Sequence, residues 1–494
     1  MTLFAQIKRL GADTAIYGIS TIVGRFLTFL LVPFYTNVLL PGEYGIVSYI
    51  YSLIAFVNVI YSYGMESAYF KYFSTLEIGT EKQNFTTPFL SVLATSAAFS
   101  FFIAAAAHQI LHLINVSESY ISIIYFTAGI LAFDALAIIP FASLRMERKA
   151  KRFATYKLLN IVINVVLNIY LLVFLKMGIK GIFISGFAAS ASTFLFLLPT
   201  IIKHFSLPPS GALYKALLKY GVPYIPAGLA TMAIQVIDRP ILRAFTNDSV
   251  VGIYQANYRL GIFMMLIVSM YDYAWRPFYF SIVKEPNAKQ IFSRVLTYLV
   301  LFMAAVFLVL TFFVDDIVKF RMFGRYLIHP NYWGGLNIVP IVLLGYLFLG
   351  VSTSLTAGIY IEKRTKLLSI NTFVGAAVNI VANYFLIPHY GMTGAAWATF
   401  LAYFAMAGVV YVIVQKIYPI SYELWRLFKI AIAAGGVTAL YYLLSPHWLN
   451  IHTGIFIELM KFGLLALFFV LMYVMQFFNR EEIGKLRNVW EKGL

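Results

Sequence analysis

The chain has 494 residues, of which 61% are hydrophobic and 12% are charged, whereas a soluble domain is about half apolar and about a quarter charged. This composition excludes a water-soluble globular protein. The net charge of +17 is spread too thinly between apolar runs to form a nucleic-acid-binding face, so we expect no nucleic-acid partner. The absence of cysteine excludes a disulfide framework, thiolate metal sites and a cysteine nucleophile.

Apolar runs long enough to cross a bilayer fill most of the chain. Crossing about 30 Å of hydrocarbon needs roughly 20 mainly apolar residues in a helix. We therefore predict an all-α integral membrane protein with about fourteen transmembrane helices. In chain order these cover approximately residues 12–33, 44–64, 85–111, 120–144, 154–175, 181–202, 217–242, 252–275, 292–314, 336–361, 367–387, 393–415, 424–444 and 455–478.

The positions of Lys and Arg predict the orientation of these helices. The first run is too long for a signal peptide and has no small-residue cleavage pattern after it, so we expect a retained helix. If the N-terminus is cytoplasmic, cytoplasmic segments carry roughly four times as many Lys and Arg residues as outer connections. This bias predicts that both termini lie in the cytoplasm.

An internal repeat follows the fourth predicted helix. The pair Asn164 and Asn168 recurs about 215 residues later as Asn379 and Asn383. A cluster of one Glu and basic residues before each pair, and a Gly-x-x-Gly turn after it, recur in the same order. Each pair lies on one helix face, where interhelical packing and substrate contact are both open interpretations.

The repeat predicts two units that face each other. Six helices per unit is an even number, so both copies enter the membrane from the same side and enclose a central cavity. We predict six-helix bundles over residues 1–210 and 211–416. Residues 417–494 then form two appended helices and a cytoplasmic tail.

Three arginines mark the region where the two bundles should meet. Arg25 and Arg259 lie within apolar runs, about 12 and 10 Å below the outer surface at 1.5 Å per residue, and Arg239 lies near the outer end of the seventh run. The planar guanidinium suits phosphate oxygens. We predict that these arginines bind a phosphate or pyrophosphate headgroup. The alternative is that Arg25 and Arg259 neutralise buried carboxylates.

Two carboxylates lie in the same apolar runs. Asp134 is near the middle of the fourth run, and Asp238 directly precedes Arg239. A carboxylate at this depth is either protonated or paired. A coupling-ion site and a structural partner for an arginine are therefore both open for Asp134 and Asp238.

Helix breakers occur in the first half of the seventh run, at Pro223, Pro226 and Gly228. Such residues are tolerated in the membrane where neighbours or cavity water satisfy the freed carbonyls. A mobile gate or hinge and a static kink are both compatible with them. No catalytic motif, metal-binding motif or nucleotide-binding motif occurs, so we expect no enzyme activity, no metal and no cofactor.

Six short motifs are spread along nearly the whole chain. They are Leu40-Pro-Gly-Glu-Tyr-Gly45, the segment from Pro140 to Arg145, Tyr220-Gly-Val-Pro-Tyr-Ile-Pro226 with Asp238-Arg239, Val251-Gly-Ile-Tyr254, Trp275-Arg-Pro-Phe278, and Ile387-Pro-His-Tyr-Gly391 with Gly394-Ala-Ala396. In this order they resemble the oligosaccharide flippases, or polysaccharide biosynthesis proteins, of the multidrug/oligosaccharidyl-lipid/polysaccharide exporter superfamily.

The resemblance implies a V-shaped pair of bundles in the inner membrane around a cationic cavity. It implies alternating-access flipping of an undecaprenyl-pyrophosphate-linked oligosaccharide, or its dolichyl counterpart, to the outer leaflet for O-antigen, capsule or exopolysaccharide. The expected partners are membrane lipids and the glycosyltransferases and polymerase of the same pathway, and we expect a monomer.

Two other functions are considered beside the flippase. One is a cation-coupled multidrug exporter of the same superfamily, against which the buried arginines and the two extra helices argue. The other is a membrane-embedded polysaccharide polymerase or ligase, against which the absence of a large outer loop argues.

Overall fold

The computed structural model of the protein describes residues 18, 22–322, 324–451 and 454–478. These residues are almost entirely helical, which confirms the predicted all-α class. Within this part of the chain, the strands are β1 (Arg321–Met322) and β2 (Arg325–Tyr326), which pair antiparallel in a short hairpin.

The N-terminal half, which here means residues 22–221, begins with an apolar helix over Ile22–Val38 whose last part is α2. Its described elements are α2 (Leu31–Val38), α3 (Pro41–Ser62), α4 (Met65–Thr75), α5 (Glu81–Ala105), α6 (Ala107–Leu113), η1 (Glu118–Tyr120), α7 (Ile121–Met146), α8 (Ala150–Ile169), η2 (Tyr170–Phe174), α9 (Gly178–His204) and α10 (Gly211–Gly221). We group α10 with this half because it packs against α4 and α5.

The C-terminal half, which here means residues 224–417, is followed by two appended helices. Its elements are α11 (Tyr224–Val236), α12 (Asp238–Phe245), α13 (Asp248–Tyr258), η3 (Arg259–Gly261), α14 (Ile262–Ile282), α15 (Ala288–Lys319), η4 (Pro330–Ile338), α16 (Val339–Leu355), α17 (Ala357–Ile361) and α18 (Lys366–Ile417). The appended helices are α19 (Leu424–Ile451) and α20 (Gly454–Val474).

Eleven helices of the described chain are long and apolar enough to cross a membrane. The apolar helices Ile22–Val38 and Tyr224–Val236 are shorter. Helix α18 has 52 residues but contains a non-helical residue, Gly391, with φ 55° and ψ −131°, a conformation that glycine adopts at little cost. Helix α18 is counted as one span although it joins two helices at this break. The predicted number of fourteen transmembrane helices therefore stays a prediction.

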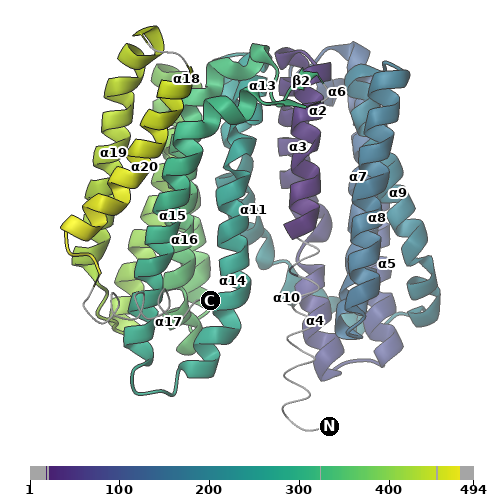
Figure 1. Cartoon of the computed structure of the whole chain (residues 1–494). Helices are drawn as coiled ribbons and strands as arrows, with labels where there is room; N and C mark the ends of the chain where they lie inside the picture. Colours follow the sequence, from purple (N-terminus) through teal and green to yellow (C-terminus); the bar gives the residue numbers. More distant parts are fainter. Residues whose placement is uncertain (1–17, 19–21, 323, 452–453, 479–494) are drawn as a thin grey trace.

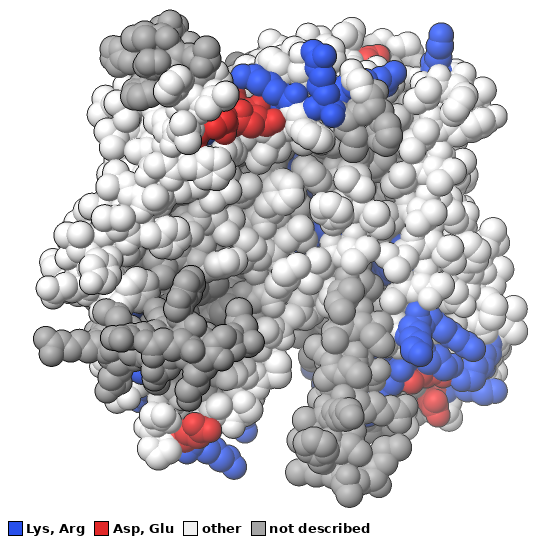
Figure 2. Space-filling view, viewed as in Figure 1, with Lys and Arg blue, Asp and Glu red and all other residues white. Residues whose placement is uncertain are grey.

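The two halves stand side by side, and α19 and α20 lie on the far side of the C-terminal half, against α15 (Figure 1). Lys461 of α20 is buried and bonds to Asp316 of α15 and, at 2.9 Å, to Glu458. On the visible face, charged side chains gather at the two ends and leave a broad uncharged band between them (Figure 2). Such a band is the surface that a bilayer requires.

The halves touch backbone to backbone at the end that the charge bias assigns to the outside. A Cβ atom on Gly45 of α3 would lie 1.7 Å from the carbonyl oxygen of Asp248, and one on Gly252 of α13 would lie 1.9 Å from that of Pro41. Only glycine permits this approach. We call this contact, with the hydrogen bonds described next, the outer junction.

Hydrogen bonds across the halves complete the outer junction. Asn37 donates to the Tyr326 carbonyl at 2.8 Å, and the Tyr332 hydroxyl donates to the Leu39 carbonyl at 3.0 Å. Arg243 of α12 donates to two backbone carbonyls that follow α6, those of Ile114 and Asn115. The molecule is therefore closed at its outer end.

The repeated asparagines have the same local geometry in both halves. Asn168 donates to the carbonyl oxygen and to Oδ1 of Asn164 at 2.8 and 3.0 Å, and Asn383 bonds to Asn379 at the same two distances. Asn168, Asn379 and Asn383 are buried. This agreement is what a duplicated unit predicts.

Candidate binding cavity

Four connected spaces lie inside the N-terminal half, inside the C-terminal half and between them. An inner space of about 620 Å³ lies toward the predicted cytoplasmic end, and a central space of about 490 Å³ lies between the halves. An outer space of about 420 Å³ lies below the outer junction. A tyrosine pocket of about 300 Å³ lies within the C-terminal half. Neighbouring spaces share lining residues, so we treat them as one cavity.

Arg259 is the residue that joins three of these spaces. It is the first residue of η3 and lines the central space, the outer space and the tyrosine pocket. Its side chain is exposed to the cavity and has no hydrogen-bond or ion-pair partner among the described residues. A guanidinium at this depth is stable only when it faces water or an anionic ligand.

Arg25 reaches across the central space from the opposite half. It lies on the helix Ile22–Val38 and donates from Nη1 to the Ser269 hydroxyl of α14 at 2.6 Å. Arg25 and Arg259 both line the central space, so the fold brings together the two arginines that the sequence places at similar depth. No carboxylate among the described residues pairs with either.

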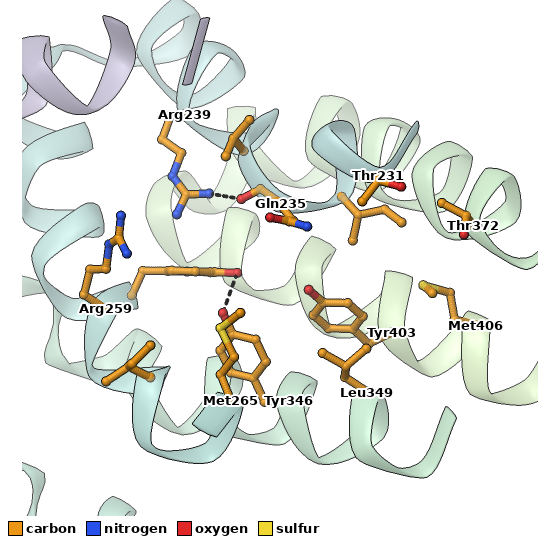
Figure 3. A pocket seen from close by; sticks show the side chains of 14 residues that line it. Thr231, Gln235, Arg239, Arg259, Met265, Tyr346, Leu349, Thr372, Tyr403 and Met406 are labelled. Atoms are coloured by element: carbon orange, nitrogen blue, oxygen red, sulfur yellow. Dashed lines mark hydrogen bonds between the residues drawn. The ribbon is translucent and has the colours of Figure 1, made fainter. Parts of the chain in front are cut away.

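Arg239 differs from these two arginines because its charge is already paired. It is 5% exposed, and its Nη1 lies 2.5 Å from Oδ1 of Asp238 and 2.5 Å from the carbonyl oxygen of Gln235. Its Nε donates to Gln255 at 3.0 Å, and the guanidinium lies 4.5 Å from the centre of the Tyr258 ring. Arg239 thus lines the tyrosine pocket and the outer space with its charge already paired, as in a structural arginine of the cavity wall (Figure 3).

The two carboxylates have different surroundings. Asp238 is 2% exposed, and its second oxygen accepts a hydrogen bond from Tyr254 at 2.5 Å. Both of its oxygens are therefore engaged, as a structural partner of Arg239 requires. Asp134 of α7 instead faces the inner space and accepts one hydrogen bond, from Ser190 at 2.7 Å.

Lys157 is a cavity residue that the sequence reasoning missed. We predict a helix over residues 154–175 that contains Lys157, but we assign this residue no cavity role from the sequence. In the structure it lies in α8 and lines both the inner and the central space. Its Nζ lies 4.5 Å from the centre of the Phe141 ring. The spacing of Lys157, Asn160 and Asn164 on one helix face was the signal that could have identified it, because all three line the cavity.

The end of the inner space that the charge bias assigns to the cytoplasm carries an ion pair. Arg145 and Glu66 lie 2.6 Å apart, with both side chains 45% exposed. Arg145 also lies 4.8 Å from the centre of the Phe70 ring. Both residues line the inner space, so its opening presents one positive and one negative group. Within the described residues, no cluster of three or more acidic or His side chains could hold a metal ion.

The predicted helix breakers lie where the seventh run is interrupted. Pro223 lies between α10 and α11, and Pro226 falls in the first turn of α11. Gly228 lies where α11 meets α3, because a Cβ there would lie 2.7 Å from Val59. The interruption is where the chain passes from one half to the other, and its role as a hinge stays a prediction.

Comparison with known proteins identifies relatives of the whole architecture. The family of polysaccharide biosynthesis proteins matches residues 10–283. The lipid II flippase MurJ in an inward closed conformation has a TM-score of 0.74 at 16% identity, over 93% of this chain and 99% of that one. No curated protein sequence matches the chain.

Multidrug transporters share the fold at lower similarity. An inward-facing MATE family transporter has a TM-score of 0.63 at 14% identity, over 79% of this chain and 94% of that one. The Vibrio cholerae MATE transporter VcmN in its bent form has a TM-score of 0.54 at 12% identity, over 86% and 98%. These likenesses show the fold, whereas the sequence match covers more than half of the chain. The chain therefore belongs to the polysaccharide biosynthesis protein family.

Proposed function

We propose that the protein flips a polyprenyl-pyrophosphate-linked oligosaccharide, with an undecaprenyl or dolichyl carrier, from the cytoplasmic to the outer leaflet by alternating access. The family and the fold are those of multi-pass membrane transporters and flippases. The observation that carries the proposal is Arg259, an unpaired guanidinium at the junction of three cavity spaces. A pyrophosphate is the anionic group of a lipid-linked sugar, and a guanidinium binds its oxygens in a planar fork.

Arg25 supplies the second positive charge in this proposal. In the structure its partner is a neutral hydroxyl, Ser269, on the opposite half. A phosphate oxygen forms a stronger, charge-assisted hydrogen bond than a neutral hydroxyl does. Pyrophosphate held between Arg25 and Arg259 would therefore link the two halves and neutralise both guanidiniums before the cavity changes its access.

The remaining charged residues take supporting roles. Arg239 and Asp238 have a structural role in the cavity wall beside Arg259, since the two residues neutralise each other's charge. Asp134 is the candidate for a coupling ion, because its carboxylate faces the inner space with a single hydrogen bond from Ser190.

The proposal includes a location and a pathway. The protein lies in the inner membrane with cytoplasmic termini, as a monomer of two six-helix units over residues 1–210 and 211–416 with appended helices beyond. The first helix of the second unit, α10, packs against the N-terminal half. Its product enters O-antigen, capsule or exopolysaccharide synthesis, in which glycosyltransferases supply the lipid-linked sugar and a polymerase consumes it. The transport step needs no covalent chemistry.

A cation-coupled multidrug exporter is the alternative function. The MATE transporters share the fold, and Asp134 with Glu66 supplies acidic groups to the inner space. Against this alternative, the central space is lined by Arg25, Lys157 and Arg259. Three positive charges disfavour a cationic drug.

Substitution of Arg25 and Arg259 by alanine, singly and together, tests the proposal. Charge-assisted hydrogen bonds contribute roughly 1.5–3 kcal/mol, so each single change should lower flipping by about 10-fold or more, and the double change should abolish it. Surface polysaccharide is measured in a host lacking its own flippase, with the amount of protein in the membrane as reference. Arg325→Ala, on the outer hairpin, is the matched control.

Two results would contradict the flippase. One is unchanged surface polysaccharide in the double variant at normal membrane levels. The other is export of ethidium that survives Arg259→Ala but is lost in Asp134→Asn, which would assign the protein to the multidrug exporters.

A further inference from the structure

The tyrosine pocket lies beside Arg259 and inside the C-terminal half. Its volume of about 300 Å³ is at the lower end of the range of ligand pockets. Tyr258, Tyr346 and Tyr403 form one side of it, and Tyr346 donates to Tyr258 at 3.4 Å. Figure 3 shows Gln235 and Thr231 across the pocket from Tyr403. This size and lining suit a small ligand rather than an extended chain.

Two polar groups in this pocket have no partner among the described residues. The side-chain amide of Gln235 is exposed to the cavity, and the hydroxyl of Tyr403 borders the same pocket without a hydrogen bond. The hydroxyls of Thr231 and Thr372, in contrast, donate to backbone carbonyls of their own helices. A free amide and a free phenol at membrane depth are costly unless water or a ligand satisfies them. They offer a ligand both donors and acceptors.

The charge in this pocket is confined to its mouth. Its lining contains two charged residues, and Arg239 is already paired with Asp238, whereas Arg259 is free. The rest of the surface is uncharged, and its apolar part includes Leu349 and Met406. The matching ligand is neutral, carries hydroxyl groups as well as an apolar face, and is attached to an anion. A pyranose ring next to a pyrophosphate has these properties.

We propose that the tyrosine pocket binds the sugar ring directly attached to the pyrophosphate, and that Gln235 and Tyr403 select this sugar by hydrogen bonds to its hydroxyls. The inference rests on the proposed function, because Arg259 must hold the pyrophosphate at the pocket mouth. The apolar ring face packs against the aromatic and thioether side chains of the wall. The sugars farther along the chain extend into the larger central and inner spaces.

The test compares lipids with and without a sugar. The purified protein in nanodiscs is titrated with undecaprenyl pyrophosphate and with the same lipid carrying one glucose, one galactose or one N-acetylglucosamine. The wild type should bind at least one sugar-bearing lipid about 10-fold or more tightly than the bare lipid, since each pair of hydrogen bonds left unmade is expensive. Gln235→Leu with Tyr403→Phe should remove this preference. Because Gln235 also lines the central space, the affinity for the bare lipid is compared in Tyr403→Phe, where it should be unchanged.

Matched variants separate this inference from the proposed function. Thr231 lines the same pocket, but its hydroxyl already donates to a carbonyl of its own helix. The Thr231→Val variant should therefore keep the sugar preference. Arg259→Ala should weaken the binding of all the lipids alike. Tyr403→Phe alone removes one oxygen atom and should still lower the preference, so the test stands even if the double variant misfolds.

Each other outcome has a definite meaning. A wild type that binds all sugar-bearing lipids no better than the bare lipid overturns the sugar pocket but leaves the flippase intact. A preference that survives the double variant also overturns it. A wild type that does not bind the bare lipid, or an Arg259→Ala variant that binds it normally, contradicts the proposed function itself.

Discussion

The two ends of the interface between the halves are built in different ways. At the outer junction, Gly45 and Gly252 bring backbone against backbone, and hydrogen bonds to carbonyl groups run from one half to the other. At the end that the charge bias assigns to the cytoplasm, here called the cytoplasmic end, the ion pair of Glu66 with Arg145 lies within the N-terminal half, and that of Asp272 with Arg276 lies within α14. Among the described residues, no ion pair of this end joins the halves.

The difference indicates where the structure resists a change of access. Opening toward the outside must separate close-packed backbone and break hydrogen bonds between the halves. Opening toward the cytoplasm breaks none of the ion pairs at that end. Changes at the outer junction should therefore shift the balance between the two access states, whereas changes to the cytoplasmic ion pairs should affect only stability.

The largest effect is expected from Gly45→Ala, which breaks the outer junction. The new methyl group would lie 1.7 Å from the Asp248 carbonyl oxygen, and overpacking against well-packed groups costs about 1–3 kcal/mol or more. The outer end should then stay open, and transport should be lost. A cysteine introduced at Ser48, in the outer space, should then be labelled from outside by a maleimide that does not cross the membrane. The labelling reports on this site alone, because the natural chain has no cysteine.

Gly42→Ala is the control for this change. A Cβ at Gly42 would lie 3.3 Å from the Ser249 hydroxyl, a contact that a small side-chain shift relieves. Labelling of the reporter should stay low in this variant. Normal transport and a protected reporter in Gly45→Ala would show that the outer junction is not what closes the cavity.

A smaller shift is expected from Arg243→Ala. This side chain bonds to Asp248 at 2.5 Å within its own half and to the carbonyls of Ile114 and Asn115 across the interface. Charge-assisted hydrogen bonds contribute roughly 1.5–3 kcal/mol, which partial exposure reduces, so the labelling rate of the same cysteine should rise by about tenfold. Arg321→Ala, whose bond stays within the outer hairpin, should leave the rate unchanged, and an equal rise there would refute the assignment.

The smallest effect on the access state is expected from removing the ion pairs of Glu147 at the cytoplasmic end. Burial acts to raise the pKa of Glu147, but hydrogen bonds from Lys149 and Lys203 outweigh it and lower the pKa from 4.5 to about 2. A lowered pKa means that the contribution to stability is present above about pH 4.5 and is lost as the pH falls toward 2.

Glu147→Gln should therefore lower the melting temperature slightly at pH 7, and the difference from wild type should shrink below about pH 4.5. The outer cysteine reporter should not respond. Glu285→Gln, an exposed carboxylate without an ion pair among the described residues, serves as the control. A change in reporter labelling in Glu147→Gln would mean that the cytoplasmic ion pairs also set the access state.

The sequence predicted the helical class and the meeting of Arg25 with Arg259, because charge at membrane depth is rare and the repeat relates the two halves. It could not distinguish Arg239 from Arg259. Their difference arises from the ion pair with Asp238 and from Gln255 and Tyr258, which the fold places against one guanidinium and not the other.

Two other features could not be read from the sequence for related reasons. Lys157 lies in a predicted helix close to a basic loop, so its charge is counted with those that set the topology, although the structure places it on the cavity face of α8. The close approach at Gly45 and Gly252 depends on how the halves dock. A repeat can suggest that these glycines are equivalent, but it does not show that each meets the other half's backbone.

The glycine contact at the centre of the outer junction has a consequence for how the protein responds to its surroundings. Neither Gly45 nor Gly252 has a side chain that titrates, so the strength of this contact depends little on pH or salt. At the outer junction, a dependence of transport on protons or ions can enter through the Arg243–Asp248 pair beside the glycines. A second place is the charged inner space around Asp134 and Lys157. The molecule thus combines a backbone contact that does not titrate at one end with a charged space facing the cavity toward the other.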